Sequence, residues 1–342
     1  MTDKPLFSIL VPCCDVAPYV GECIDSLKVQ TVPFEAILVI EESKDETEPI
    51  IRAAVAGDAR FRVITEPRSG SPSTPRNTGL GVATGDYVIF LDGDDTLTPT
   101  ALADLAEWIR RHPGTDLFPC AVREAEILHD NYPAGLQDRV LTGPEATLTV
   151  ARQNAVPMAM AQMTVCRRAF LDAHALRFVD GLRNEDEEFT PRALYLAASV
   201  VPTHLPFYLY RRRENSITTA SNARNLRLQA IATVYRNLFR FYDEVHPTAE
   251  ISRAWARNWL NTFNTAFFYE RAGMTYDPAA VLSALRNCLE DAPPAFACLT
   301  RHASAPKRVG AALTRLAVRT GWIWPVRTFF RRYYRLLGYK TA

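Results

Sequence analysis

The chain has 342 residues, of which 48% are hydrophobic, so it is long enough for one large packed domain and an addition to it. Its net charge of +1 argues against nucleic acid as a partner of the whole molecule. The seven cysteines include no CxxC pair, and the N-terminal apolar run is too short for a signal peptide, so we expect reduced thiols in a cytoplasmic protein. The sequence has no 18-residue apolar stretch that would predict a membrane-spanning helix.

Strand and helix patterns alternate through the first hundred residues. Short apolar runs of strand composition occur at 7–12, 32–40, 61–64 and 87–91. Segments 16–27, 46–56 and 75–83, which lie between these runs, have helical spacing. The alternation predicts an α/β fold with a Rossmann-like, mostly parallel sheet and helices on both faces.

Three carboxylates, Asp92, Asp94 and Asp95, follow the run at 87–91. Open α/β sheets bind their ligands at the carboxyl ends of such strands. Like charges this close repel one another unless a cation neutralises them, and Mg²⁺ or Mn²⁺ prefers oxygen ligands. The stretch therefore predicts a metal site, and a solvated Asp-rich turn is the alternative.

Three segments carry a family resemblance: FSILVPCCDVAPYVGECIDSLKVQ, LVIEESKDETEPI and PRNTGLGVATGDYVIFLDGDD. In this order they resemble the nucleotide-sugar domain of family-two inverting glycosyltransferases with the GT-A fold, of the bacterial cell-surface polysaccharide type. The resemblance is close over the first hundred residues or so and looser to about residue 220. It implies sugar transfer from a nucleotide-diphosphate sugar, of the UDP-sugar class, to a glycan or lipid-linked acceptor, with Mn²⁺ or Mg²⁺ as cofactor.

The resemblance places the base and ribose at two strand ends. Pro12 ends the first strand and Asp15 follows it, and Glu41 and Glu42 follow the second strand. A carboxylate at this place can accept a hydrogen bond from a base N–H. The family usually has Asp-Asp-Gly-Ser where this chain has Glu-Glu-Ser, so the longer side chains leave the identity of the base open.

The resemblance also assigns Arg76 in PRNTG as a nucleotide contact, because an Arg fork suits a phosphate or a base carbonyl. It makes Asp92 and Asp94 the DxD pair, with Asp94 and Asp95 nearest the ribose and the metal. The cation would stabilise charge on the departing nucleoside diphosphate.

Two later stretches resemble the family more loosely. In GLRNEDEEFT, at 181–190, Asp186 is expected to be the general base, and an acidic helix N-terminus is the alternative. In FYLYRRRENSITT, at 207–219, Arg211, Arg213 and Ser216 are expected to contact the diphosphate, and a basic surface loop is the alternative.

We expect a glycosyltransferase domain at 1–220, with nucleotide-sugar binding at 1–98 and the acceptor side and closing loop at 99–220. A helical region follows at 221–342. Its tail, 301–342, has ten Lys or Arg residues interleaved with aromatics and has no Asp or Glu. This pattern predicts peripheral contact with the inner face of the cell membrane. A basic helix packed on the body and a helix for homo-oligomer formation are the alternatives.

Two other function classes fit the sequence less well. A nucleotidyltransferase acting on a sugar phosphate is disfavoured because VPCCDVAPY lacks a Gly-rich phosphate loop. A catalytically inactive scaffold at the membrane would be expected to have lost acidic ligands, yet Asp92, Asp94, Asp95 and Asp186 are all present.

Overall fold

The computed structural model describes residues 4–153, 159–212, 224–268, 277–289 and 293–337. It divides into two compact units, the first of residues 1–149 and 158–218 and the second of residues 150–157 and 219–342. Among the described helices, none combines the length and the apolar character needed to cross a membrane.

The central sheet of the first unit has a mostly parallel order. Among the described residues, six strands form it in the order β3-β2-β1-β4-β9-β6. Their bounds are β1 (Phe7–Cys13), β2 (Phe34–Glu41), β3 (Phe61–Glu66), β4 (Tyr87–Phe90), β6 (Leu117–Pro119) and β9 (Thr164–Arg167). Strands β1 to β4 are parallel, and β9 is antiparallel to both of its neighbours. The predicted α/β fold class is confirmed.

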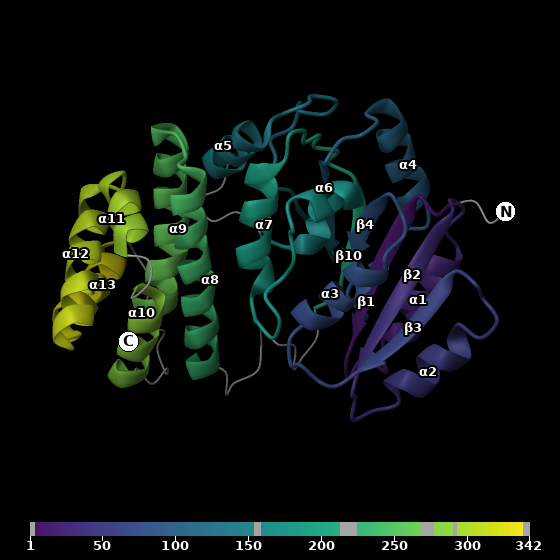
Figure 1. Cartoon of the computed structure of the whole chain (residues 1–342), viewed down its shortest axis with the longest axis horizontal. Coiled ribbons are helices and arrows are strands. Elements are labelled where there is room, and N and C mark those ends of the chain that lie inside the picture. Colours follow the sequence, from purple (N-terminus) through teal and green to yellow (C-terminus); the bar gives the residue numbers. More distant parts are fainter. Residues whose placement is uncertain (1–3, 154–158, 213–223, 269–276, 290–292, 338–342) are drawn as a thin grey trace. The chain divides into compact units, whose positions relative to one another are not determined.

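Helices cover both faces of this sheet (Figure 1). The helices of this unit are α1 (Val20–Lys28), α2 (Thr47–Ala54), α3 (Ser73–Val82), α4 (Ala101–Arg111), α6 (Arg168–Ala173) and α7 (Glu185–Leu196). A further helix, α5 (Gly143–Gln153), lies away from the strands and spans the boundary at residue 149. Successive side chains of β1 point to opposite faces of the sheet, so they contact helices on different faces. Ile9 and Val11 share a core with Ile24 of α1, whereas Leu10 faces α3, where Gly79 allows close approach.

A second sheet, absent from the sequence-based expectation, pairs strands far apart in the chain. Its order is β5-β10-β7-β8, with bounds β5 (Thr96–Leu97), β7 (Ala121–Glu124), β8 (Ile127–His129) and β10 (Pro206–Tyr210). The short stretch at 117–124 holds two strands, β6 and β7, which belong to different sheets. Only Cys120 separates them, and its N–H donates to Met163 while that of Ala121 donates to Leu205.

Gly85 sets how closely the entry to β4 approaches β1. A Cβ at this position would lie 2.6 Å from the backbone nitrogen of Ser8, a distance that real Cβ atoms do not reach. The Gly85 N–H donates to the Ser8 hydroxyl at 2.8 Å. Glycine therefore lets β4 lie in register beside β1, with its carboxyl end next to that of β1.

The second unit is helical and confirms the expected C-terminal helical extension. Its helices are α8 (Arg224–Val245), α9 (Ala249–Phe268), α10 (Pro278–Leu289), α11 (Pro293–Arg301), α12 (Ala305–Thr320) and α13 (Trp324–Leu336). The core is aromatic: Phe239, Phe263 and Phe296 contact one another, and Phe268 stacks on Phe330 with ring centroids 4.7 Å apart. Burial of such rings supplies much of a helical core's stability.

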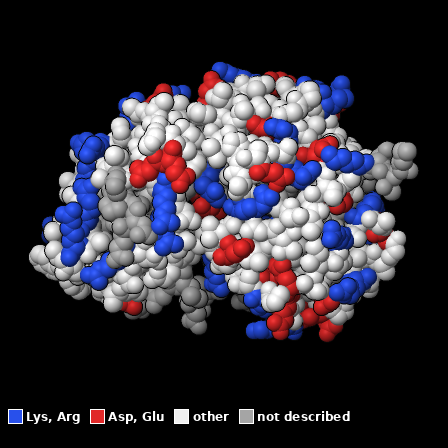
Figure 2. All heavy atoms as spheres, viewed as in Figure 1, with Lys and Arg blue, Asp and Glu red and all other residues white. Residues whose placement is uncertain are grey.

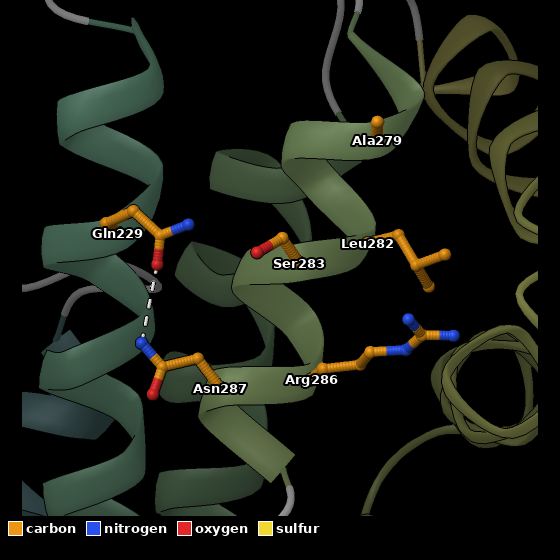
Figure 3. A pocket seen from close by; sticks show the side chains of 6 residues that line it. All are labelled: Gln229, Ala279, Leu282, Ser283, Arg286 and Asn287. Atoms are coloured by element: carbon orange, nitrogen blue, oxygen red, sulfur yellow. Dashed lines mark hydrogen bonds between the residues drawn. The ribbon is translucent and has the colours of Figure 1, made fainter.

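An open groove of about 620 Å³ lies beside α8 and α10. Figure 3 shows Ser283 and Asn287 on the side of Gln229, while Arg286 and Leu282 point away from it. The Asn287 amide donates to the Gln229 carbonyl at 3.3 Å and accepts from Arg236 at 2.7 Å. The amides that line the groove are therefore bonded to neighbouring side chains.

Candidate active site

The three predicted carboxylates form a short turn after β4, which we call the carboxylate turn (residues 92–95). The Asp95 N–H donates to the Asp92 carbonyl at 3.0 Å, and the Gly93 N–H donates to the Pro12 carbonyl at 3.3 Å. A Cβ at Gly93 would lie 3.1 Å from that carbonyl oxygen. The turn therefore packs against the end of β1, where the sequence placed the nucleotide.

Asp92 is held from two sides. Arg76 donates to Asp92 Oδ1 at 2.7 Å, and the Gln162 amide donates to Asp92 Oδ2 at 2.6 Å. Gln162 is buried and precedes β9 in the short 3₁₀ helix η1 (Ala161–Met163). Sequence reasoning missed Gln162, and the one signal for it is a polar side chain in the apolar run AMAQM.

Arg76 is buried, with 1% of its side chain exposed. Its second guanidinium nitrogen is paired with Glu185, and the group lies 5.3 Å from the ring centroid of Phe178. Burial alone would lower the pKa of Arg76, but the charges of Asp92 and Glu185 raise it overall, so the side chain stays ionised. In this conformation Arg76 contacts protein carboxylates, whereas the sequence predicted a nucleotide contact.

Asp186 is the second residue of α7 and follows Glu185, the partner of Arg76. It is partly exposed, whereas Glu185 is buried. Burial of the carboxyl group and the nearby charge of Glu185 raise the pKa of Asp186 well above its ordinary value, against the lowering effect of Arg76. A carboxylate whose pKa is raised is a stronger base. Arg76 therefore joins the carboxylate turn to the helix end that carries the predicted base.

Asp95, a predicted metal ligand, lies at the inner side of the carboxylate turn. It is 1% exposed, and both of its oxygens accept hydrogen bonds, one from the Tyr208 hydroxyl and one from the Arg211 backbone N–H at 2.7 Å. Burial, and then the charges of Asp92 and Asp94, raise the pKa of Asp95 to about 8. The side chain is turned into the protein, while Asp94 in the same turn is partly exposed. The metal contact predicted for Asp95 stays a prediction, and in this structure both of its oxygens bind protein groups.

The predicted base pocket begins at Asp15, which has a left-handed backbone, φ 51°. Its carboxylate accepts from the Lys44 N–H at 2.7 Å and pairs with Arg68 at 2.7 Å. The hydrogen bond from the Lys44 N–H is the main cause that lowers the pKa of Asp15, and burial opposes it. Pro12, at the end of β1, is partly exposed in the same region.

The two glutamates at the end of β2 have different environments. Glu41 is buried and accepts a hydrogen bond from the Ser69 backbone N–H at 2.6 Å. Glu42 is exposed. Glu41 therefore holds the loop that leads to α3, and Glu42 is the member of the pair that solvent and ligands can reach.

Arg211 reaches the carboxylate turn through its backbone. Its guanidinium pairs with Glu22 of α1 and lies 5.2 Å from the ring centroid of Tyr19. Arg213 and Ser216, the other predicted diphosphate contacts, lie outside the described residues. Within the described ranges, no group of three or more His, Cys, Asp or Glu side chains is arranged so that it could hold a metal ion.

The aromatic residues of the basic tail divide into two groups. Phe330 and Tyr334 are buried in the helical core. Trp322 and Trp324, at the corner between α12 and α13, are 61% and 51% exposed, and Arg327 lies 4.7 Å from the Trp324 ring centroid. Figure 2 shows Lys and Arg side chains gathered over the C-terminal helices at the left of the view.

Curated relatives of this chain are bacterial glycosyltransferases. It is 33% identical over 219 residues to the glycosyltransferase EpsJ of Bacillus subtilis, an alignment that covers 63% of each chain. It is 29% identical over 222 residues to poly(ribitol-phosphate) beta-N-acetylglucosaminyltransferase TarS of Staphylococcus aureus, over 63% of this chain and 37% of TarS. The chain thus covers less than two thirds of the length of these relatives.

Solved structures share the fold at lower sequence identity. TarS residues 1–349 in complex with UDP-GlcNAc match with a TM-score of 0.71 and 21% identity, over 95% of this chain and 91% of that one. The mannosyltransferase PcManGT from Pyrobaculum calidifontis, in complex with GDP-Man and Mn²⁺, matches with a TM-score of 0.53 and 16% identity, over 96% and 84%. These likenesses establish the GT-A fold.

The sequence profile of glycosyl transferase family 2 matches residues 8–174, the range that holds β1 to β4, the carboxylate turn and Gln162. With the GT-A fold and these relatives, the match shows that residues 8–174 of this chain are similar to glycosyl transferase family 2.

Proposed function

We propose that this protein is an inverting glycosyltransferase that moves a sugar from a nucleotide-diphosphate sugar to a hydroxyl of a glycan or lipid-linked acceptor in cell-surface polysaccharide synthesis. The observation that carries the proposal is the buried Arg76, which pairs with Asp92 of the carboxylate turn and with Glu185 beside Asp186. One cation thus connects a donor-side turn to a base-bearing helix. We assign residues 1–98 to donor binding and 99–220 to the acceptor side.

Asp186 is the proposed general base. In an inverting transfer, the acceptor oxygen attacks the anomeric carbon on the face opposite the diphosphate. A carbon–oxygen bond to the acceptor forms, the bond to the diphosphate oxygen breaks, and the acceptor proton passes to Asp186. The raised pKa of Asp186 favours this proton transfer. Glu185 is held by Arg76, so it fixes the start of α7 rather than competing for the proton.

A divalent cation, Mn²⁺ or Mg²⁺, is part of the proposal, and Asp94 is its proposed protein ligand. Carboxylate oxygen suits these ions, and Mg²⁺ is commonly bound by one or two carboxylates together with substrate phosphates. Such a site needs few protein ligands, which fits a turn in which Asp94 is partly exposed, Asp92 is bonded to Arg76 and Gln162, and Asp95 is buried. When bound, the cation would supply positive charge for the leaving diphosphate.

UDP-sugar is the proposed donor class. Support comes from the family resemblance and from TarS, whose structure contains UDP-GlcNAc. Glu42 and Asp15 are the proposed contacts of base and ribose, because Glu42 is exposed and Asp15 lies nearby at the end of β1. Arg211, Arg213 and Ser216 remain proposed contacts of the diphosphate.

Calorimetric titration of UDP, GDP, CDP and dTDP, each with and without Mn²⁺, tests the donor site. We expect metal-dependent binding of one nucleotide and its loss in Asp94→Ala. Absence of binding by all four would remove the proposed activity and favour a scaffold role.

Asp186→Asn tests the base. The amide keeps the size of the side chain but cannot take a proton, so we expect donor binding to remain and turnover to fall by about 10²- to 10⁴-fold. Unchanged turnover in a transfer assay would remove Asp186 from this role.

We also propose that the protein is cytoplasmic and contacts the inner face of the membrane through its tail, 301–342. Exposed tryptophans beside arginines suit an anionic lipid surface. The double change Trp322→Ser and Trp324→Ser should weaken pelleting with anionic vesicles, with Val29→Ser, a 55% exposed apolar site in the first unit, as control. Equal pelleting of all three proteins, or equal binding to neutral vesicles, would contradict this contact.

A further inference from the structure

Tyr208 is buried at the inner side of the carboxylate turn. It lies in β10, opposite Leu97 of β5, and its side chain is fully buried. The Tyr208 hydroxyl accepts a hydrogen bond from the Asp92 backbone N–H at 3.2 Å and donates to the Asp95 carboxylate. One phenol therefore binds both ends of the turn.

Asp95 extends this contact to the end of β10. Its second oxygen accepts the Arg211 backbone N–H at 2.7 Å, so both oxygens are committed to the protein. The Asp95 N–H also closes the turn on the Asp92 carbonyl at 3.0 Å. Asp94 lies between two residues that are fixed, and its own side chain is partly exposed.

We propose that Tyr208 and Asp95 are positioning residues that orient Asp94 toward the cation, and that Asp95 is not itself a metal ligand. This inference rests on the proposed function, which makes Asp94 the ligand. Small divalent cations tolerate little error in ligand placement, and a ligand is held accurately only when its supports are packed and hydrogen-bonded. The phenol and the buried carboxylate supply that support from within the fold.

The first test compares Asp95→Asn with Asp94→Asn, using electron paramagnetic resonance of free Mn²⁺ in the presence of UDP. The Asp95→Asn amide can still accept the Arg211 N–H and can donate to the phenol oxygen, so we expect Mn²⁺ affinity to fall less than about fivefold, the effect of one weakened hydrogen bond. Asp94→Asn should abolish binding. Equal loss in the two variants would overturn the proposal, because it would make Asp95 a ligand.

The second test is Tyr208→Phe, which keeps the ring and removes only the hydroxyl. We expect Mn²⁺ affinity and kcat to fall about tenfold each, as for a lost buried hydrogen bond. Tyr210→Phe, on the same strand with a partly exposed side chain, is the matched control and should leave both unchanged. A change in Tm with unaltered Mn²⁺ affinity would show a purely structural role and overturn the proposal.

The two levels of failure can be told apart. If the unaltered protein fails to bind Mn²⁺ whichever nucleotide is present, the proposed function fails and the positioning role fails with it. If the unaltered protein binds Mn²⁺ and Tyr208→Phe binds it equally well, only the positioning role fails.

Discussion

Replacing Arg76 by Met tests whether one buried cation holds the two sides of the site together. Methionine keeps most of the apolar contact with Phe178 but leaves Asp92 and Glu185 without their ion pair. Breaking a buried pair costs about 3–5 kcal/mol. Glu185, with 7% of its side chain exposed, is left as a buried charge without its partner and accounts for most of the cost. Asp92 is 27% exposed and retains its hydrogen bond from Gln162. We expect a loss of about 4 kcal/mol in the free energy of unfolding of the first unit.

The pH dependence separates an electrostatic loss from a packing loss. Without Arg76, burial raises the pKa of the Glu185 carboxyl group further, because the charge that lowers it is gone. The folded variant then binds more protons than the unfolded chain does, so its deficit is small at low pH and grows as pH rises through the raised pKa. Hydrogen exchange of β1 and β4 at pH 5 and pH 8, with increasing urea, measures the deficit in this unit.

Arg68→Met is the matched control, because Arg68 pairs with Asp15 at a similar distance but is 38% exposed. Exposed pairs contribute about 0–1 kcal/mol. A deficit below about 1 kcal/mol in Arg76→Met, or one that is the same at both pH values, would refute the reasoning.

Three further predictions test separate features of the protein. Gly85→Ala forces a Cβ to 2.6 Å from the backbone of Ser8 and should cost about 1–3 kcal/mol by urea unfolding, whereas Gly81→Ala, with nothing within 4 Å, should not destabilise the unit. Lys307 is buried, and burial and then the charge of Arg257 lower its pKa to about 8. In the unfolded chain Lys307 keeps its proton up to the ordinary, higher lysine pKa, so the free energy of unfolding should rise with pH above about 8. Lys307→Met should therefore add about 1–3 kcal/mol to the free energy of unfolding at pH 7 and nothing near pH 10. A Tm gain that is independent of pH would contradict this. For Asp186, which must be deprotonated to act, transfer should fall as pH drops through its raised pKa. An acid limb at the ordinary carboxyl pKa would contradict its role.

The sequence predicted the central sheet because its signals are local. Apolar runs such as FSILVP and YVIFL are buried on both faces, and helical spacing between them leaves few alternatives to parallel strands. The division at Cys120 could not be predicted, because it depends on backbone partners, Met163 and Leu205, that are distant in the chain. The same holds for the second sheet, in which β5 has two residues and no pattern of its own.

The candidate site, too, could be predicted from the sequence only in part. Residue types at strand ends indicated which carboxylates gather, but their orientation depends on side chains that the motifs do not include. Asp95 faces inward because Tyr208, more than a hundred residues later, offers a hydroxyl. Gln162 has no motif, and its role as a partner of Asp92 emerges only when η1 lies beside β4.

The single residue between β6 and β7 has a mechanical consequence. One residue spans at most about 3.6 Å, so the two sheets cannot separate at this connection. The carboxylate turn, which follows β4 in one sheet and leads into β5 in the other, is a second short connection between the two sheets. The first unit therefore keeps the ends of its two sheets close together at both connections.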